Sequence, residues 1–125
     1  MKFFEHSEFD QEGLPGSGFK MNQTFLIHLD ELRRRCNFPF IVSSGYRSPE
    51  YNAKISPTGL KGPHTTGKAV DLLVSREQAY IILREALAMK VFTGIGVNQK
   101  GESRFLHLDT LTKEEASPRP TVWSY

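Results

Sequence analysis

The sequence lacks the cysteine content that disulfides or a thiolate metal site require. It contains one cysteine, Cys36, among 125 residues, which excludes an internal disulfide and a four-cysteine structural zinc site. Cys36 falls on the apolar side of a helical pattern, so we expect a core residue rather than a reactive thiol. A chain of this length can bury a hydrophobic core, and we expect residues 1–125 to form a single domain without cross-links.

Long apolar runs are absent as well. No stretch approaches the ~20 apolar residues that span a bilayer, so we expect no membrane span. The opening segment, MKFFEHSEFD, carries acidic residues where a secretory signal peptide needs an apolar run. We therefore expect the chain to be made in a cytoplasm without a signal peptide.

The chain has no strong excess of charge of either sign. Its 16 Lys and Arg residues and 14 Asp and Glu residues give a net charge of +2, and the basic residues are spread along the sequence. Proteins that bind nucleic acid usually concentrate their basic residues in one patch. We therefore expect no nucleic-acid partner, and we expect a monomer.

Apolar residues with helical periodicity predict two long helices. The first carries one apolar stripe at i, i+4, i+7 and i+11, formed by Phe25, Leu29, Leu32 and Cys36. Asn22 is a suitable N-cap for this helix, and the arginines that end at Arg35 complement the negative end of its dipole. The second helix follows Ser75, which matches a capping box together with Gln78.

Short apolar, β-branched and aromatic runs predict the strands. They occupy residues 40–42, which we expect to be buried, residues 69–74, 92–97 and 104–109, and the closing TVWSY. Loops rich in Gly and Pro lie at 11–20 and 56–67, and a short helix follows the turn SSGYRS. Because helices come early and strands late, we predict an α+β fold with a mainly antiparallel sheet and helices packed on one face.

His64 and Asp71 belong to different predicted elements and can still reach one ion. His64 is in the loop 56–67, whereas Asp71 lies in the strand that follows, on the face opposite Val70, Leu72 and Val74. Gly67 can adopt the backbone conformation that bends the chain back between them.

The strand 104–109 places a second histidine and a carboxylate on one face. Alternation turns Leu106 and Leu108 toward the core, and His107 and Asp109 toward the opposite side. Two histidines and one carboxylate form a known zinc ligand set, in which a fourth position open to water marks a catalytic site. Spacing alone leaves this hypothesis and the alternative of separate, solvated side chains equally open.

Four motifs follow one another in the order SGYRSPEYN, HTTGKAVD, GIGV and FLHLDT. With the opening FFEHSEF and the closing RPTVWSY, they make the chain resemble the zinc D-alanyl-D-alanine carboxypeptidase family over roughly residues 3–125. That family includes phage L-alanyl-D-glutamate endolysins, and the hedgehog signalling domain shares its fold. The resemblance implies a hedgehog/DD-peptidase-like fold and a short bacterial or prophage member that uses Zn2+ to hydrolyse peptidoglycan stem peptides.

The resemblance also implies roles for four residues of this sequence. His64, Asp71 and His107 match the zinc ligands of the family. Arg47, in SGYRS, matches the arginine that holds the substrate carboxylate or carbonyl oxygen. A planar guanidinium suits that role because it can bind a carboxylate through two hydrogen bonds.

Two positions depart from the family pattern, and one of them leaves the general base open. Gly62 stands where the family often has Ser, and Arg104 stands where many members have the acidic base. The candidates are Asp109 and Glu102. We favour Asp109 as the catalytic residue that handles the proton of the attacking water, because it projects from the same strand face as His107, ~7 Å further along. The alternative role for Asp109 is to accept a hydrogen bond from a ligand histidine and fix its tautomer.

The type of activity stays open between three possibilities. The chain could be a D,D-carboxypeptidase, or an endopeptidase of the endolysin type that cuts inside the stem peptide. The alternative is a non-catalytic, zinc-stabilised module that binds cell-wall peptide or a protein partner. Without a signal peptide, we expect the chain to act on the wall after release or as part of a phage particle.

Overall fold

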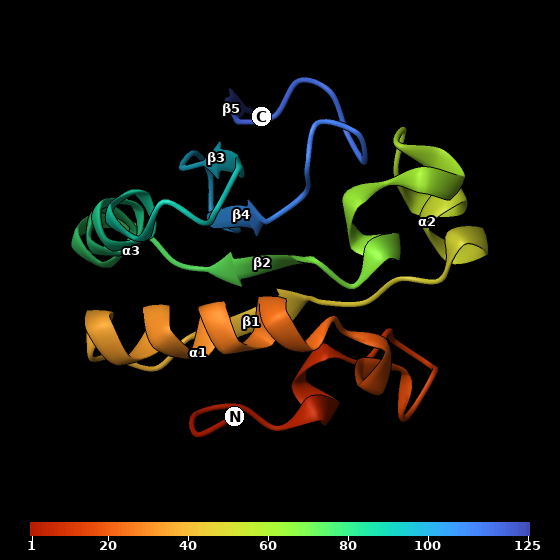
Figure 1. The fold of residues 1–125 in the computed structure, drawn as a ribbon, viewed down its shortest axis with the longest axis horizontal. Helices are drawn as coiled ribbons and strands as arrows, with labels where there is room; N and C mark the ends of the chain where they lie inside the picture. Colours follow the sequence, from red (N-terminus) through yellow and green to blue (C-terminus); the bar gives the residue numbers. More distant parts are fainter.

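The computed structural model describes all 125 residues, which form an α+β fold with three helices and one five-stranded sheet (Figure 1). The helices are α1 (Gln23–Cys36), α2 (Pro49–Ile55) and α3 (Arg76–Met89). The strands are β1 (Ile41–Ser44), β2 (Ala69–Leu73), β3 (Gly94–Asn98), β4 (Phe105–Asp109) and β5 (Thr121–Ser124). Four 3-10 turns complete the fold: η1 (His6–Phe9), η2 (Ser17–Lys20), η3 (Gly59–Lys61) and η4 (Pro63–Thr66). No helix combines the length and the apolarity that crossing a bilayer requires.

The sheet has the order β1-β2-β4-β3-β5. β1, β2, β4 and β3 pair antiparallel with their neighbours, whereas β5 pairs parallel with β3. The predicted α+β class is confirmed, but the sheet is mixed rather than mainly antiparallel. The physical reason is the last connection. β4 ends and β5 starts at the same end of the sheet, where Gly94 of β3 pairs with Asp109 on one side and with Thr121 on the other, so β5 runs parallel to β3 along its outer edge.

One face of the sheet carries the hydrophobic core, which α1 and α3 cover. Alternation along β2 and β4 turns four fully buried side chains toward these helices: Val70, Leu72, Leu106 and Leu108. The apolar stripe of α1 packs onto them, and the helix starts where the Asn22 side chain accepts a hydrogen bond from the Phe25 amide at 2.9 Å. The predicted helix, its cap and its inward face are therefore confirmed.

Two local predictions are wrong. The helix α3 does begin after Ser75, but the Ser75 side chain makes no capping hydrogen bond, because the next residue, Arg76, starts the helix with a left-handed φ of 54°. Of the run 40–42, only Phe40 is buried, at 7% exposure, because β1 starts at Ile41 as an edge strand of the sheet and Ile41 is 61% exposed.

The opposite face of the sheet is where chemistry is possible. α2, η3 and η4 lie together near the start of β2, away from α3 (Figure 1). They carry the segment from residue 48 to residue 66 over the polar side chains of β2 and β4. The helix α2 therefore does not join α1 and α3 on the core face but belongs to the wall of the site.

Cys36 offers a simple check on the core. It ends α1, is 8% exposed, and burial raises the pKa of its thiol to about 11 from the ordinary value of 9.0. Because the thiolate is the reactive form, we expect a disulfide reagent at pH 8 to modify the folded chain about a hundredfold more slowly than the unfolded chain. Equal rates with and without denaturant would show that Cys36 is accessible and the end of α1 loosely packed.

Candidate metal centre

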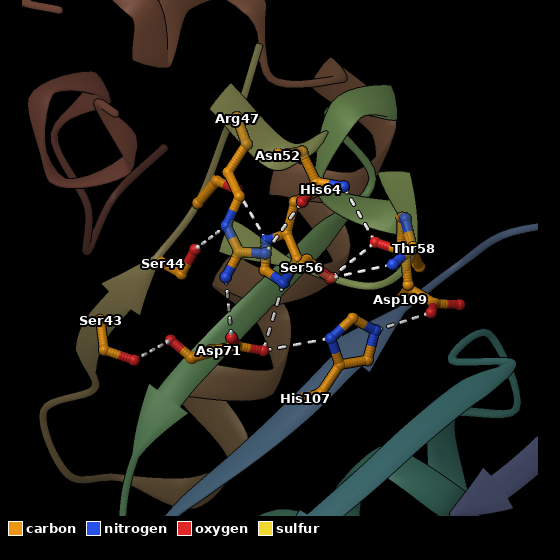
Figure 2. A network of polar contacts seen from close by, with 12 residues as sticks. Ser43, Ser44, Arg47, Asn52, Ser56, Thr58, His64, Asp71, His107 and Asp109 are labelled. Carbon is orange, nitrogen blue, oxygen red and sulfur yellow. Dashed lines mark hydrogen bonds and ion pairs between the residues drawn. The ribbon is translucent and has the colours of Figure 1, made fainter. Parts of the chain in front are cut away.

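The pairing of β2 with β4 brings two of the expected ligands together. Asp71 lies directly opposite His107 in the antiparallel register, and both side chains project from the face away from the core. Directly opposed side chains in such a pair have Cβ atoms about 5 Å apart. In this pair the His107 Nδ1 atom lies 3.1 Å from the Asp71 Oδ1 atom (Figure 2).

His64 reaches the same point from the turn η4. The chain passes from η4 into β2 at Gly67, whose φ of 74° is left-handed and whose missing side chain leaves room for the Lys20 carbonyl. The ring of His64 is held by the Gly45 carbonyl, 2.8 Å from Nδ1, which leaves Nε2 3.3 Å from Asp71 Oδ1. His64, Asp71 and His107 are all buried, and one ligand atom from each lies within 4.8 Å of the others.

The hydrogen bonds around both histidines decide where their protons lie. A carbonyl oxygen can only accept, so the Gly45 carbonyl places a proton on Nδ1 of His64. His107 lies between two carboxylates, and Asp109 Oδ2 at 2.7 Å from Nε2 is closer than Asp71 Oδ1 at 3.1 Å from Nδ1, which favours a proton on Nε2 in the neutral ring. In the neutral rings, the other nitrogens then point lone pairs at the Asp71 carboxylate, and a positive charge is required among these three groups.

The pKa values of the cluster express the same demand for positive charge. Burial lowers the pKa of His107, but its hydrogen bonds to Asp109 and Asp71 outweigh this and raise it above the ordinary value. Burial raises the pKa of Asp71, and the hydrogen bonds from His107 and His64 outweigh that and hold it well below its usual range. A divalent cation can supply this charge, and two imidazole nitrogens with one carboxylate oxygen suit zinc.

Arg47 borders the cluster from the loop between β1 and α2. Its Nε donates to Ser44 Oγ and its Nη1 donates to Asn52 Oδ1, both at 3.0 Å, while Nη2 lies 3.7 Å from Asp71 Oδ2 (Figure 2). Asn52 is fully buried and is itself held by Thr58. The guanidinium is therefore fixed in orientation beside the carboxylate of the cluster.

The surroundings of Asp109 favour the second of the two roles considered for it. Its side chain is fully buried, and each carboxylate oxygen accepts two hydrogen bonds. Oδ2 accepts from His107 and Arg119, and Oδ1 accepts from Arg119 and the Leu111 amide. Burial raises the pKa of Asp109, and its bonds to His107 and Arg119 outweigh this and lower it. A carboxylate so occupied is suited to orienting His107 and poorly suited to accepting a proton from water.

Glu102 lies away from the cluster. It is exposed in the loop between β3 and β4, where it lines a hollow with Arg76 and Gln78. Arg104 borders the same hollow and donates to the Gly101 carbonyl at 3.0 Å. The structure therefore does not bring Glu102 together with the three clustered residues.

A cleft of about 530 Å³ opens beside His107. Two chain segments contribute most of its lining, residues 56–58 and 61–63 and residues 115–117 and 119. Trp123 and Tyr125 also line the cleft, and the ring centroids of Trp123 and His107 lie 5.0 Å apart. The loop 56–67 and the C-terminal segment therefore both border the cleft.

Sequence reasoning missed Arg119 and Trp123. Arg119 is the partner of Asp109, and its guanidinium carbon lies 5.2 Å from the centre of the Trp123 ring. Trp123 is the single tryptophan of the chain and sits in the closing motif RPTVWSY, which gave the one available signal. The contacts of Trp123 with His107 and of Arg119 with Asp109 depend on β5 joining the sheet beside β3, which the sequence pattern does not reveal.

Comparison with known proteins agrees with the geometry. The family model described as Peptidase M15 matches residues 4–109. No curated protein and no solved structure matches the chain. The matched range contains the three clustered residues, ends on Asp109, and leaves Arg119 and Trp123 outside.

Proposed function

Because the chain belongs to the peptidase M15 family, that of the zinc D-alanyl-D-alanine carboxypeptidases, we propose that it is a zinc peptidase that hydrolyses peptidoglycan stem peptides. The observation that carries the proposal is the buried cluster of His64, Asp71 and His107 at the side of a cleft. In the tautomers that the surrounding hydrogen bonds favour, Nε2 of His64 and Nδ1 of His107 both direct a lone pair toward the Asp71 carboxylate.

The three clustered residues are the proposed ligands, and the rest of the chain orients them. Zinc held there would supply a Lewis acid that lowers the pKa of a water to ~7 and polarises a carbonyl group. The Gly45 carbonyl keeps Nε2 of His64 free for a cation, and Asp109 keeps Nδ1 of His107 free. Arg47, beside Asp71, adds the positive charge that would bind a substrate carboxylate or an oxygen that becomes negative during attack.

The cleft supports a peptide substrate with free carboxylates. Residues of the 56–63 loop and of the C-terminal segment line it, and Lys61 adds a positive charge to this lining. Trp123 and Tyr125 provide aromatic surface next to His107. Peptidoglycan stems carry free carboxylates and small side chains, which match these features. We propose either removal of a terminal residue, as by a D,D-carboxypeptidase, or cleavage inside the stem, as by an endopeptidase.

One observation favours the second candidate, a zinc-stabilised binding module without catalysis. No carboxylate is free to take a proton from water at the cluster. Asp109 is fully hydrogen-bonded, Glu102 lines a different hollow, and Glu115, on the wall of the cleft, is paired with Lys68 at 2.8 Å. Hydrolysis therefore has to be tested directly.

The test is incubation of the zinc-loaded chain with purified peptidoglycan, followed by mass analysis of the fragments. We expect stems that lack a terminal residue if the chain is a carboxypeptidase, and split stems if it is an endopeptidase. A chelator should stop the reaction and added zinc should restore it. If the zinc-loaded chain sediments with the peptidoglycan and the stem peptides stay intact, the peptidase is refuted and the binding module is established.

Arg47→Lys should be a damaging change although it keeps the charge. A lysine ammonium cannot bond Ser44 and Asn52 and still present a planar fork to the substrate. We expect turnover of a stem peptide to fall tenfold or more, which corresponds to a lost contact of ~1.5–3 kcal/mol, with zinc still bound.

The control is Arg84→Lys, which alters an exposed arginine on α3 that bonds only Glu85. It should leave turnover unchanged. Unchanged kinetics in both variants would remove Arg47 from the reaction.

A further inference from the structure

We propose that Arg119 is a positioning residue of the metal centre, which acts through Asp109 to hold His107 in the tautomer that leaves Nδ1 free for the ion. This inference rests on the proposed zinc site and adds to it a residue that lies beyond the range matched by the family. Arg119 touches none of the three ligands directly, so its effect passes through the carboxylate.

The contact between Arg119 and Asp109 is bidentate. Arg119 Nε donates to Oδ1 at 3.0 Å and Nη2 donates to Oδ2 at 2.9 Å. The remaining terminal nitrogen, Nη1, donates to the Pro118 carbonyl at 2.9 Å. The paired side chains are 8% and 0% exposed, so water does not replace these bonds. This parallel geometry fixes the plane of the carboxylate as well as its position.

Three further features hold the pair in place. The guanidinium carbon of Arg119 lies 5.2 Å from the centroid of the Trp123 ring, a cation–π contact that restrains the side chain. Pro118 and Pro120 flank Arg119 and restrict the backbone on both sides. Gly94 lies beneath the carboxylate, where a Cβ atom would overlap both Asp109 oxygens. A glycine at position 94 of β3 is therefore needed to leave room for the Asp109 carboxylate.

The orientation of Asp109 determines the proton position on His107. Oδ2 accepts from His107 Nε2 at 2.7 Å and from Arg119 at the same time. The bidentate contact with Arg119 therefore also keeps Oδ2 in position to accept from Nε2. Without the contact with Arg119, Oδ1 keeps only the 3.3 Å bond from the Leu111 amide, and the carboxylate can rotate away from His107. His107 then loses the acceptor that selects its Nε2–H form, and a proton on Nδ1 would block the ligand position.

The experiment compares wild type with Arg119→Gln and Arg119→Lys by two readouts. The first is the tautomer of His107 in the metal-free protein, read from long-range 1H–15N correlations of the ring at a pH high enough to make the ring neutral, since its neighbours raise its pKa. The second is zinc affinity, measured by competition with a chelator. We expect Arg119→Gln to lose the dominant Nε2–H form and to bind zinc 10- to 100-fold more weakly, and Arg119→Lys to fall between it and wild type.

A merely structural role for Arg119 would lower the melting temperature and leave both readouts unmoved in the folded variants. That result, with zinc affinity within about twofold of wild type, overturns the inference. Should Arg119→Gln fail to fold, Arg119→Lys decides, since it keeps a positive charge beside Asp109 and loses only the fork. Arg84→Gln, which removes an exposed arginine–carboxylate bond, is the matched control and should change neither readout.

Both readouts are independent of hydrolysis. A wild-type chain that shows the tautomer and the affinity change but cuts no stem peptide would refute the proposed function and leave the inference on Arg119 standing. A chain that hydrolyses stem peptides equally well in wild type and folded Arg119→Gln, with unchanged zinc affinity, would do the reverse.

Discussion

Replacing His107 with alanine should remove bound zinc and lower turnover of a stem peptide by at least about a thousandfold. His107 is 3% exposed and sits in the middle of β4, directly opposite Asp71, so no other side chain can take its place. A metal contributes several kcal/mol of transition-state stabilisation, and about 4 kcal/mol corresponds to a thousandfold. Metal analysis of the purified protein should fall from about one zinc per chain to near zero. His64→Ala should behave in the same way.

The matched control is His28→Ala. His28 lies on α1 and borders a hollow with Lys68 and Glu115 that none of the three clustered residues lines. This variant should keep both zinc and turnover. Retained activity in metal-free His107→Ala would contradict the proposed metal centre, whereas loss of zinc in His28→Ala would indicate that the metal binds elsewhere.

The pairing that forms the cluster could be predicted only in part. Alternation along 69–73 and 105–109 correctly places Asp71 and His107 on the faces away from the core, because a strand repeats every two residues. The sequence does not state that these strands are neighbours in register, since register is decided by packing of the whole sheet. The four ordered motifs supplied that information through the resemblance to a family, not through local physics.

The environment of Asp109 could not be predicted from its own strand. Position on β4 made Asp109 a reasonable base two residues from His107, but a base also needs an unoccupied oxygen. The residue that occupies it, Arg119, is ten positions later in the chain and comes close only because β5 lies alongside β3. A carboxylate that looks available in the sequence is thus enclosed by a tertiary contact. The same connection made the sheet mixed.

Asp109→Asn should separate the two roles of this residue by their effects on zinc and on turnover. An amide keeps one acceptor oxygen and replaces the other with an NH2 group, so it cannot serve both His107 and Arg119. We expect zinc affinity to fall 10- to 100-fold and turnover to recover when zinc is saturating. Stability should also fall, by about 3 kcal/mol, because the buried Arg119 loses its charged partner. Denaturant unfolding of the metal-free protein measures that loss.

The opposite pattern identifies a general base. If Asp109→Asn binds zinc as wild type does and turnover stays low at every zinc concentration, Asp109 handles the proton despite its four hydrogen bonds, and one of these must open during the reaction. Glu102→Gln is the matched control, because it makes the same acid-to-amide change in an exposed loop that lines a different hollow. It should leave zinc, turnover and stability unchanged. Loss of turnover in Glu102→Gln with zinc retained would instead mean that the β3–β4 loop moves to the cluster and supplies the base, since in the structure Glu102 lies with Arg76 and Gln78.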